Sequence, residues 1–327
     1  MKAFALIGLA FLLSACAGTP THSTSHNLPP LNTLYDFTVI DAKSGKILTV
    51  EQLARQTRDA DVVFIGEYHG NQASHLLEAE LQAALYRLRP EQILSMEQFN
   101  RDHQVQIDRY LDGEIGEKVF IKNSNAWPNY AGSYRPMVEF AKQHYLPVIA
   151  ANAPLQTVRC VGRQGKPYLE KLHANEKQAI AAKPFLSNPQ YRQKFSEFQQ
   201  QTKPDSRRRQ NQYDAQLLRD NTMAESILQA LNAYPGYQVI HLNGAFHSDG
   251  FLGTVALLKQ RRPDLKIAVI SPIRVDNPQK PTYAEEDLSK GNYLYLVQPQ
   301  PLDYVRSQNR RAAFARMFKA ADEKQCR

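Results

Sequence analysis

The feature that most constrains the fold is a repeated alternation of short apolar runs with longer amphipathic stretches. Each run is short and is bounded by glycine, proline or polar residues, which is typical of a buried strand. The stretches between several runs place apolar residues at helical spacing, as residues 75–88 do before Pro90. Such alternation predicts a parallel sheet with helices on both faces. We therefore expect an α/β fold with three layers, α/β/α, and a mainly parallel sheet.

The expected elements can be placed on the chain by these patterns. Strands are predicted at 61–66, 92–97, 146–151, 237–242 and 267–270, with an edge strand at 292–297. Helices are predicted at 75–88, 135–144 and 213–233, and an amphipathic helix in the C-terminal segment 300–327. Two long connections, near 101–134 and 155–212, are polar, aromatic and interrupted by proline. We interpret them as helical insertions that form a cap over the carboxyl edge of the sheet, with a loop at 204–211.

The N-terminus has the pattern of a bacterial lipoprotein signal. Residues 3–13 are apolar and uncharged, too short for a transmembrane helix of about 20 residues but suited to a signal peptide. The sequence LSAC that follows matches a lipobox, in which Cys16 would receive the lipid; an ordinary signal peptide with an incidental cysteine is the alternative. We expect a signal peptide at 1–15, a lipidated, flexible tether at 16–34, and the α/β domain at 35–299. The protein would then be lipid-anchored in the cell envelope, and Ala17 favours the outer membrane.

The charge of the chain bears on which partners it can bind, and its cysteines bear on disulfide formation. The formal net charge of +8 could favour an anionic surface or ligand, but runs such as Arg207-Arg208-Arg209 are typical of solvated faces. No nucleic-acid-binding module is recognisable, so no nucleic-acid partner is expected. Beside Cys16 the chain has Cys160 and Cys326, which in an oxidising compartment can either pair, tying the C-terminal tail to the domain, or remain separate thiols.

Polar and titratable residues follow the predicted strands at their carboxyl ends, where open α/β sheets bind ligands. Each has a structural explanation alone, such as a cap or a turn, but the recurrence at four strand ends predicts a functional site. Glu with His can bind a divalent metal, activate water or act as a general base, and imidazole or tyrosinate can ligate haem iron. The chain lacks HExxH, GxSxG, P-loop and GxGxxG motifs. The residues concerned are Glu67, Tyr68, His69, His75, Glu97, Asn152 and His247.

Most of these residues fall in five segments, VVFIGEYHGNQASH (62–75), SMEQF (95–99), WPNYAGSYRPMVEFAKQHYLPVIAANAP (127–154), QLLRDNTMAESI (216–227) and VIHLNGAFHSDGFLG (239–253). In combination they resemble the ChaN family of haem-binding, iron-regulated lipoproteins, within the superfamily that includes erythromycin esterases and Tiki proteases. The similarity covers about residues 35–271. It implies an α/β/α sandwich with a helical insertion, haem as the cofactor, an outer-membrane haem receptor as a partner, and paired haems between two protomers of a homodimer.

The resemblance also suggests roles for individual residues. Glu67 and His69 fall on the superfamily's G-E-x-H-type motif, Glu97 on the second-strand acid and His247 on the fourth-strand histidine. Those four would be catalytic in a hydrolase, with His69 and His247 as metal ligands. Arg219 and Asp220 would support the site from beneath, or form an internal salt bridge. The residues expected to contact haem are Tyr68, His75, Tyr130, Tyr134, Arg135, Asn152 and His247, and His69 is a further candidate axial ligand.

Three functions remain open at this point. The leading hypothesis is an outer-membrane-anchored lipoprotein that binds haem and takes part in haem and iron uptake, without necessarily catalysing a reaction. The alternative is a metal-assisted envelope hydrolase that uses Glu67, His69, Glu97 and His247. A third is a structural lipoprotein with a vestigial site. The aromatic residues Trp127, Tyr130 and Tyr134 can either cover haem or simply pack the cap.

Overall fold

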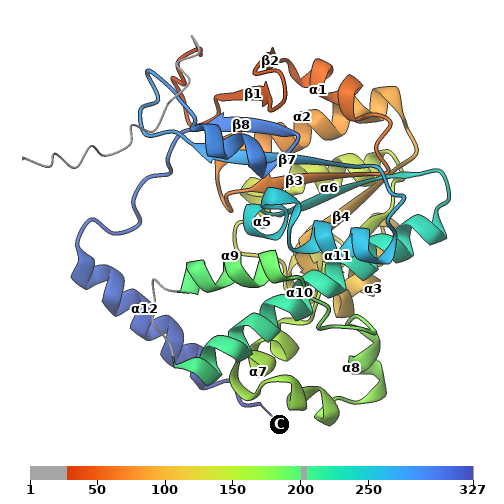
Figure 1. Ribbon diagram of the computed structural model, residues 1–327. Helices are drawn as coiled ribbons and strands as arrows, with labels where there is room; N and C mark the ends of the chain where they lie inside the picture. Colours follow the sequence, from red (N-terminus) through yellow and green to blue (C-terminus); the bar gives the residue numbers. More distant parts are fainter. Residues whose placement is uncertain (1–27, 200–204, 327) are drawn as a thin grey trace, which may run out of the picture.

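Parallel strands form the centre of the computed structural model, which describes residues 28–199 and 205–326. A single eight-stranded sheet has the order β2-β1-β8-β7-β3-β6-β4-β5 (Figure 1). Pairing is parallel from β8 to β5, whereas β1 runs antiparallel to both β8 and β2. The strands are β1 (Phe37–Asp41), β2 (Ile47–Leu48), β3 (Val62–Glu67), β4 (Gln92–Asn100), β5 (Val148–Asn152), β6 (Gln238–Gly244), β7 (Ile267–Arg274) and β8 (Tyr293–Val297).

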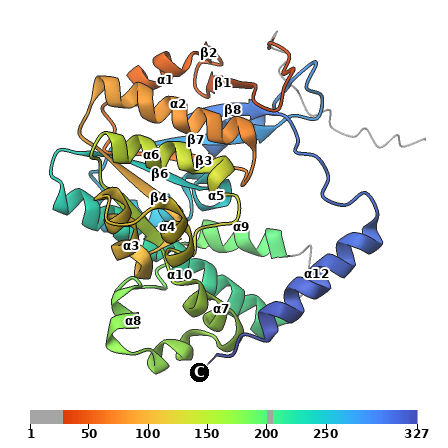
Figure 2. The same cartoon turned by 180° about the vertical axis from the view of Figure 1, so that it is seen from behind.

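Helices cover both faces of this sheet, as Figures 1 and 2 show. Successive side chains of a strand point to opposite faces, so Val63 and Ile65 pack against one helical layer while Val62 and Phe64 pack against the other. The first layer contains α1 (Val50–Thr57), α2 (Gln72–Leu88) and α6 (Arg135–Gln143), and the second contains α10 (Ser206–Ala233) and α11 (Thr254–Arg261). The predicted three-layer α/β/α fold with a mainly parallel sheet is confirmed.

Both long connections contain several short helices. The first contains η1 (Arg101–His103), α3 (Gln104–Leu111), α4 (Glu117–Asn123) and α5 (Tyr130–Ser133). The second contains α7 (Leu155–Gln164), η2 (Lys166–Lys171), α8 (Ala174–Gln178) and α9 (Pro189–Gln199). Lys194 of α9 donates hydrogen bonds to the backbone carbonyls of Phe246 and Asp249, which follow β6. Helix α9 therefore packs over the carboxyl end of that strand.

The structure corrects two predicted elements. The strand near 292–297 is not an edge strand, because β1 pairs with β8 on its far side and β2 then pairs with β1. The described part of the predicted loop 204–211 is mostly helical, because the Asp205 side chain accepts a hydrogen bond from Arg208 N and caps α10, which begins at Ser206. Residue 204 lies outside the described residues.

The chain joins the fold earlier than the predicted tether boundary at residue 34. Leu31 is only 1% exposed, packs with Ile40 and Leu294, and its N–H donates to Pro278 O. An apolar side chain buried in this way fixes the backbone beside it, so the described residues 28–34 belong to the fold. The predicted signal peptide, Cys16 and the rest of the tether lie outside the described residues.

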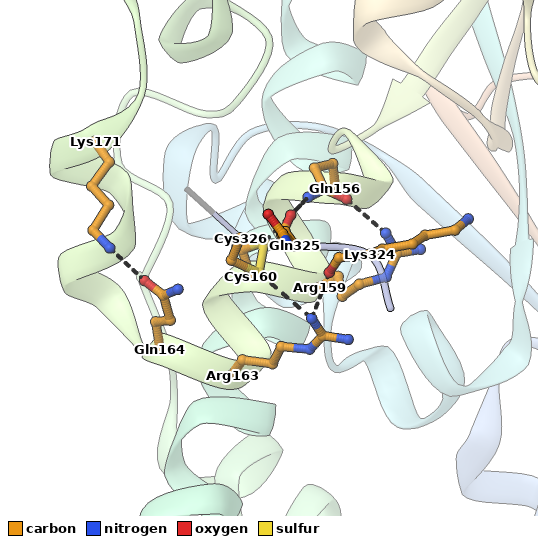
Figure 3. The surroundings of a disulfide bond; sticks show 9 residues. All are labelled: Gln156, Arg159, Cys160, Arg163, Gln164, Lys171, Lys324, Gln325 and Cys326. Atoms are coloured by element: carbon orange, nitrogen blue, oxygen red, sulfur yellow. Dashed lines mark hydrogen bonds between the residues drawn. A yellow bond between two sulfur atoms is a disulfide. The ribbon is translucent and has the colours of Figure 1, made fainter. Parts of the chain in front are cut away.

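A disulfide ties the C-terminal end to the second insertion. Helix α12 (Ser307–Asp322) extends away from β8, and Cys326 beyond it is bonded to Cys160 of α7 (Figures 1 and 3). Gln156 and Arg163, also of α7, donate hydrogen bonds to the carbonyls of Gln325 and Lys324. Pairing, one of the two states left open for these cysteines, is therefore the one observed. Across 28–199 and 205–326, no helix has both the length and the apolar character needed to cross a membrane.

Candidate functional site

The carboxyl ends of β3, β4 and β6 bring the four motif residues together, although they are far apart in the sequence. Glu67 ends β3 in register with Gly244, which ends β6. The N–H of Gly244 donates to Glu97 Oε2 of β4 at 2.7 Å, and His247 Nε2 lies 3.4 Å from Glu97 Oε1. We call the group formed by Glu67, His69, Glu97 and His247 the rim site.

Glu67 is the centre of the first half of the rim site. Its side chain is fully buried, and its Oε1 accepts hydrogen bonds from Tyr134 OH at 2.7 Å and Gln98 Nε2 at 3.1 Å. His69 Nδ1 lies 2.5 Å from the same oxygen. Burial alone would raise the pKa of Glu67, but the hydrogen bond with His69 and the groups around it hold that pKa below its ordinary value. Glu67 is therefore an anion.

A second carboxyl, Glu78 of α2, lies behind Glu67. Burial, together with the charge of Glu67, raises the pKa of Glu78 well above its ordinary value, so Glu78 keeps its proton. Among the described residues, no side chain forms a hydrogen bond with Glu67 Oε2 or Glu78 Oε1, although His75 Nδ1 lies 3.3 Å from Glu67 Oε2. Two carboxylates buried side by side cannot both stay ionised, because their negative charges repel each other. A proton on Glu78 that is directed at Glu67 removes this repulsion and gives Glu67 a hydrogen-bond donor.

Glu67, His75 and Glu78 together could be taken for a metal site, since one ligand atom from each lies within 4.8 Å of the others. The hydrogen bonds of His75 argue for a proton instead. Its Nε2 accepts from the N–H of Gly70 at 3.1 Å, so its Nδ1 carries the hydrogen and donates to Glu78 Oε2 at 2.9 Å. Burial lowers the pKa of His75, consistent with a neutral ring. Neither nitrogen of this ring has a free lone pair for a metal.

His247 forms the second half of the rim site. Its Nδ1 donates to Asp220 Oδ1 at 2.7 Å, and its Nε2 faces Glu97. Burial opposes the charge on His247, but Glu97 and Asp220 raise its pKa to about 10. Conversely, His247 lowers the pKa of Glu97, although burial raises it. The ring is an imidazolium with both N–H groups directed at carboxylates.

Asp220 of α10 fixes this imidazolium from beneath. Besides His247, its carboxylate accepts hydrogen bonds from Thr254 Oγ1 at 2.8 Å and Tyr191 OH at 2.6 Å. The predicted support of the rim by Asp220 therefore matches the geometry, and among the described side chains its ion-pair partner is His247. Burial lowers the pKa of the neighbouring Arg219, while the charges of Glu97 and Asp220 act to raise it.

His69 is the member of the rim site that reaches solvent. Its side chain is 44% exposed, and the indole of Trp127 meets it edge to face at 4.8 Å between ring centroids. Burial would lower the pKa of His69, but the hydrogen bond with Glu67 and the charge of Glu97 raise it. Gly244 makes room for the ring, because a Cβ at that position would lie 2.7 Å from His69 Nε2.

The other predicted haem contacts lie in different surroundings. Tyr130 and Tyr134 are buried among the aromatic residues of the first insertion, and burial raises the pKa of each well above its ordinary range. Tyr68 donates its hydroxyl to Pro272 O, Arg135 pairs with Glu117, and the buried Asn152 donates to Glu97 O. Neither buried phenol is placed to meet a ligand from solvent, so the geometry favours the packing role that the sequence left open.

Two buried groups near the rim site were not predicted. Glu78 occurs on the apolar face of α2 beside Leu77 and Leu81, and a carboxylate at such a position signals a buried partner. His241 lies within β6 and its Nδ1 is 2.9 Å from Ser95 Oγ. Its position inside an apolar strand gave no indication of that contact, because the neighbouring strand is known only once the sheet is assembled.

Hollows of about 690 and 510 Å³ lie elsewhere, along the β5 edge of the sheet. They share Gln104, Ile149 and Tyr234, and none of the predicted site residues lines either one. Their positions do not connect them with the rim site.

Comparison with known proteins agrees with the fold. The model of the family described as haem-binding uptake, Tiki superfamily, ChaN matches residues 53–258. The match spans more than half of the chain, and the chain belongs to this family. A search of curated protein sequences gave no match.

Several solved structures align with this chain at low sequence identity. A structure of ChaN of Campylobacter jejuni, described as showing cofacial haem binding, aligns with a TM-score of 0.60 and 15% identity, over 81% of this chain and 98% of that one. This likeness shows a shared fold. A succinoglycan biosynthesis protein aligns with a TM-score of 0.48, 11% identity, and coverage of 84% and 95%. An erythromycin esterase in its open conformation gives 0.46, 12%, and 86% and 87%.

Proposed function

We propose that this protein is a cell-envelope lipoprotein that binds haem at the rim site and holds or transfers it during haem and iron uptake. The observation that carries the proposal is membership of the haem-binding uptake family over residues 53–258. Anchoring through Cys16 in the outer membrane is part of the proposal and is supported by the lipobox. A haem receptor as partner and a homodimer are further parts, supported by the family resemblance.

We assign the iron ligand to His69. A haem ligand must reach solvent and present a free nitrogen or oxygen, and His69 does so next to the apolar surface of Trp127. Its Nδ1 is held by Glu67, an arrangement in which a carboxylate orients an imidazole and leaves Nε2 for the metal. When bound, haem would supply the iron that the uptake pathway delivers; the chain's own residues orient the imidazole and shield it on one side.

The geometry gives less support to the hydrolase alternative. That hypothesis needs His247 as a metal ligand beside His69, but His247 carries protons on both nitrogens and directs them at Glu97 and Asp220. An imidazolium has no lone pair to offer a metal. Of the two predicted imidazole ligands only His69 would then remain, and the other ligands would have to be the carboxylates of Glu67 and Glu97, which already accept hydrogen bonds within the site.

A hemin titration of the full chain tests the proposal. The wild type should show saturable binding with a Soret shift, and His69→Ala should lose most of that shift. The matched control is His103→Ala, because His103 lies outside the rim site and is only partly exposed. No saturable binding by the wild type would refute haem binding altogether. Binding that is unchanged in His69→Ala would refute only the assignment of the ligand, and sedimentation of the same samples reports whether hemin induces a dimer.

A further inference from the structure

Helix α12 and the segment before it expose several large apolar side chains to solvent. Every described side chain from residue 301 to residue 320 is exposed except Ala313, which is partly covered. Val305 is 88% exposed, Met317 54% and Phe314 48%. Soluble proteins rarely leave such side chains grouped on one element unless they meet a partner.

The charge of this element indicates the chemistry of that partner. Within Ser307–Asp322 the sequence has four basic residues and a single acidic one at its last position. Arg310 and Arg311 precede Phe314 by four and three residues, so they lie on the same side of the helix one turn earlier. A basic helix with aromatic and apolar residues between its cations is typical of an element that lies on an anionic membrane surface.

The place where α12 leaves the domain agrees with this partner. Gln298, at the start of the connection from β8 to α12, donates hydrogen bonds to Leu31 O and Thr33 O. The beginning of the described chain and the connection to α12 therefore lie side by side. An anchor at Cys16, twelve residues before the described chain begins, would tether the membrane to this same side of the domain, from which α12 extends for about 24 Å (16 residues at 1.5 Å each).

The far end of α12 is held as well. The Cys160–Cys326 disulfide and the hydrogen bonds from Gln156 and Arg163 fix the residues that follow the helix against α7 (Figure 3). The end of α12 is thus tied to α7, and the connection before it is tied to the domain at Gln298, so docking the helix would also restrict how the domain faces the surface.

We propose that α12, with the exposed residues 302–306 before it, docks on an anionic lipid bilayer surface. Phe314 and Met317 enter the interface between headgroups and acyl chains, while Arg310 and Arg311 meet the lipid phosphates. This docking is independent of haem and of the rim site. It would set the distance and direction in which the domain faces the membrane.

A fluorescence experiment on the full chain tests the proposal. The chain has one tryptophan, Trp127, so Phe314→Trp adds a single reporter whose signal is the difference from the wild type. On vesicles of phosphatidylglycerol and phosphatidylcholine with brominated acyl chains, the reporter should be quenched and shifted to shorter wavelength. On phosphatidylcholine alone, or at high salt, quenching should be largely lost, because screening weakens the attraction. Met317→Trp provides a second reporter if the first perturbs the helix.

Charge reversal identifies the residues responsible. Arg310→Glu with Arg311→Glu should lower the ratio of docked to undocked helix at least about tenfold. Lys43→Glu with Lys46→Glu changes the net charge equally in the turn between β1 and β2 and should leave docking unchanged. The proposal would be overturned if the reporter were quenched equally on neutral and anionic vesicles, or on neither. It would also be overturned if the reversal at Lys43 and Lys46 weakened docking as much as the reversal at Arg310 and Arg311. A reporter shift that needs no lipid and grows with protein concentration would instead identify a second copy as the occupant, and would also overturn it.

Discussion

His247 and His241 are six residues apart in the sequence and are both buried, yet their neighbours give them opposite charge states. His247 faces Glu97 and Asp220, which overcome burial and raise its pKa to about 10. For His241, burial is the larger effect and lowers its pKa to about 3, and its Nδ1 meets the neutral Ser95 hydroxyl. At the scale of the residue, the nearest carboxylates decide whether a buried imidazole carries a proton.

This difference predicts how stability depends on pH. In the folded protein the pKa of His247 lies above its ordinary value of 6.5. The stabilisation that His247 gives to the fold is therefore complete below pH 6.5 and is lost as pH rises toward about 10. In the folded protein the pKa of Glu97 lies below its ordinary value of 4.5. The stabilisation that Glu97 gives to the fold is therefore present above pH 4.5 and is lost in acid. His247→Gln should lower the free energy of unfolding by about 3 kcal/mol at pH 6.5, because it leaves buried carboxylates unpaired.

Urea unfolding of wild type and His247→Gln between pH 6 and pH 10 measures this effect. The stability of the wild type should fall across that range, and the variant should fall less steeply. His103→Gln is the control, since the His103 ring is 3.9 Å from Asp102 and partly exposed. A variant whose stability declines as steeply as that of the wild type would show that His247 is not the group that titrates.

Gly244 allows a second test at the residue scale. A Cβ there would lie 2.7 Å from His69 Nε2 and 2.9 Å from His69 Cε1, so Gly244→Ala should displace the ring and weaken its bond to Glu67. The ring can move into solvent, and we expect a loss of stability of only about 1 kcal/mol but a marked weakening of hemin binding. Gly253→Ala is the contrasting variant, because a Cβ at Gly253 meets the backbone oxygen of His247 at 2.5 Å and should destabilise the whole fold. Unchanged hemin affinity in folded Gly244→Ala would contradict the assigned role of His69.

The β5 strand shows how one side chain protects an element. β5 is the last strand of the sheet, and an unpaired edge can recruit another chain. Gln104 of α3 occupies this edge: its Nε2 donates to Val148 O at 2.8 Å and its Oε1 accepts from Ala150 N at 2.7 Å. The amide thus takes the place of a neighbouring strand at these two residues.

Removing that amide should expose the edge. Gln104→Ala should lower the free energy of unfolding by about 1–2 kcal/mol, because its two hydrogen bonds to β5 are lost along with an exposed one to Asp108. It should also increase self-association at high protein concentration. Light scattering and urea unfolding measure the two effects. Gln106→Ala, two residues away and bonded only to Asn123 at 3.4 Å among the described contacts, should change neither. Equal association of the two variants would show that Gln104 does not protect the edge.

At the scale of the whole molecule, the disulfide closes a long loop. Cys160 and Cys326 are separated by 166 residues, and the loop between them includes α9, α10, β6, β7 and β8. Cross-linking residues so far apart restricts the unfolded chain more than the folded one. The disulfide therefore acts on the stability of the domain as well as on the position of α12.

Cys160→Ser with Cys326→Ser should lower the free energy of unfolding by about 3–4 kcal/mol. It should also make residues 300–326 cleavable by a protease under native conditions, because only a few hydrogen bonds then hold that end. Hemin binding should be retained, since the rim site lies on β3, β4 and β6. Denaturant unfolding, limited proteolysis and hemin titration test these points on one sample. Loss of hemin binding in the folded variant would mean that the C-terminal segment contributes to the site.

The sequence by itself determined the α/β class, most of the parallel strands and the helices between them. Apolar runs such as residues 62–65 are buried on both faces, and this composition is visible without a structure. Sequence also located Glu67, His69, Glu97 and His247, because residues at the carboxyl ends of parallel strands must meet at one edge of the sheet. The sequence analysis did not predict β1 or β2. The strand β2, Ile47–Leu48, has too few residues to show a pattern.

Only the tertiary structure decided which of the candidate residues reach solvent and which are buried. Exposure separates His69 from Tyr130 and Tyr134, and it depends on the packing of α5 and α6 against the sheet. Charge state follows the same rule: only the folded chain places Glu78 behind Glu67, and Asp220 against His247. The reason is physical, because solvation and electrostatic neighbours are set by distances between segments far apart in the sequence, which no local pattern of residues contains.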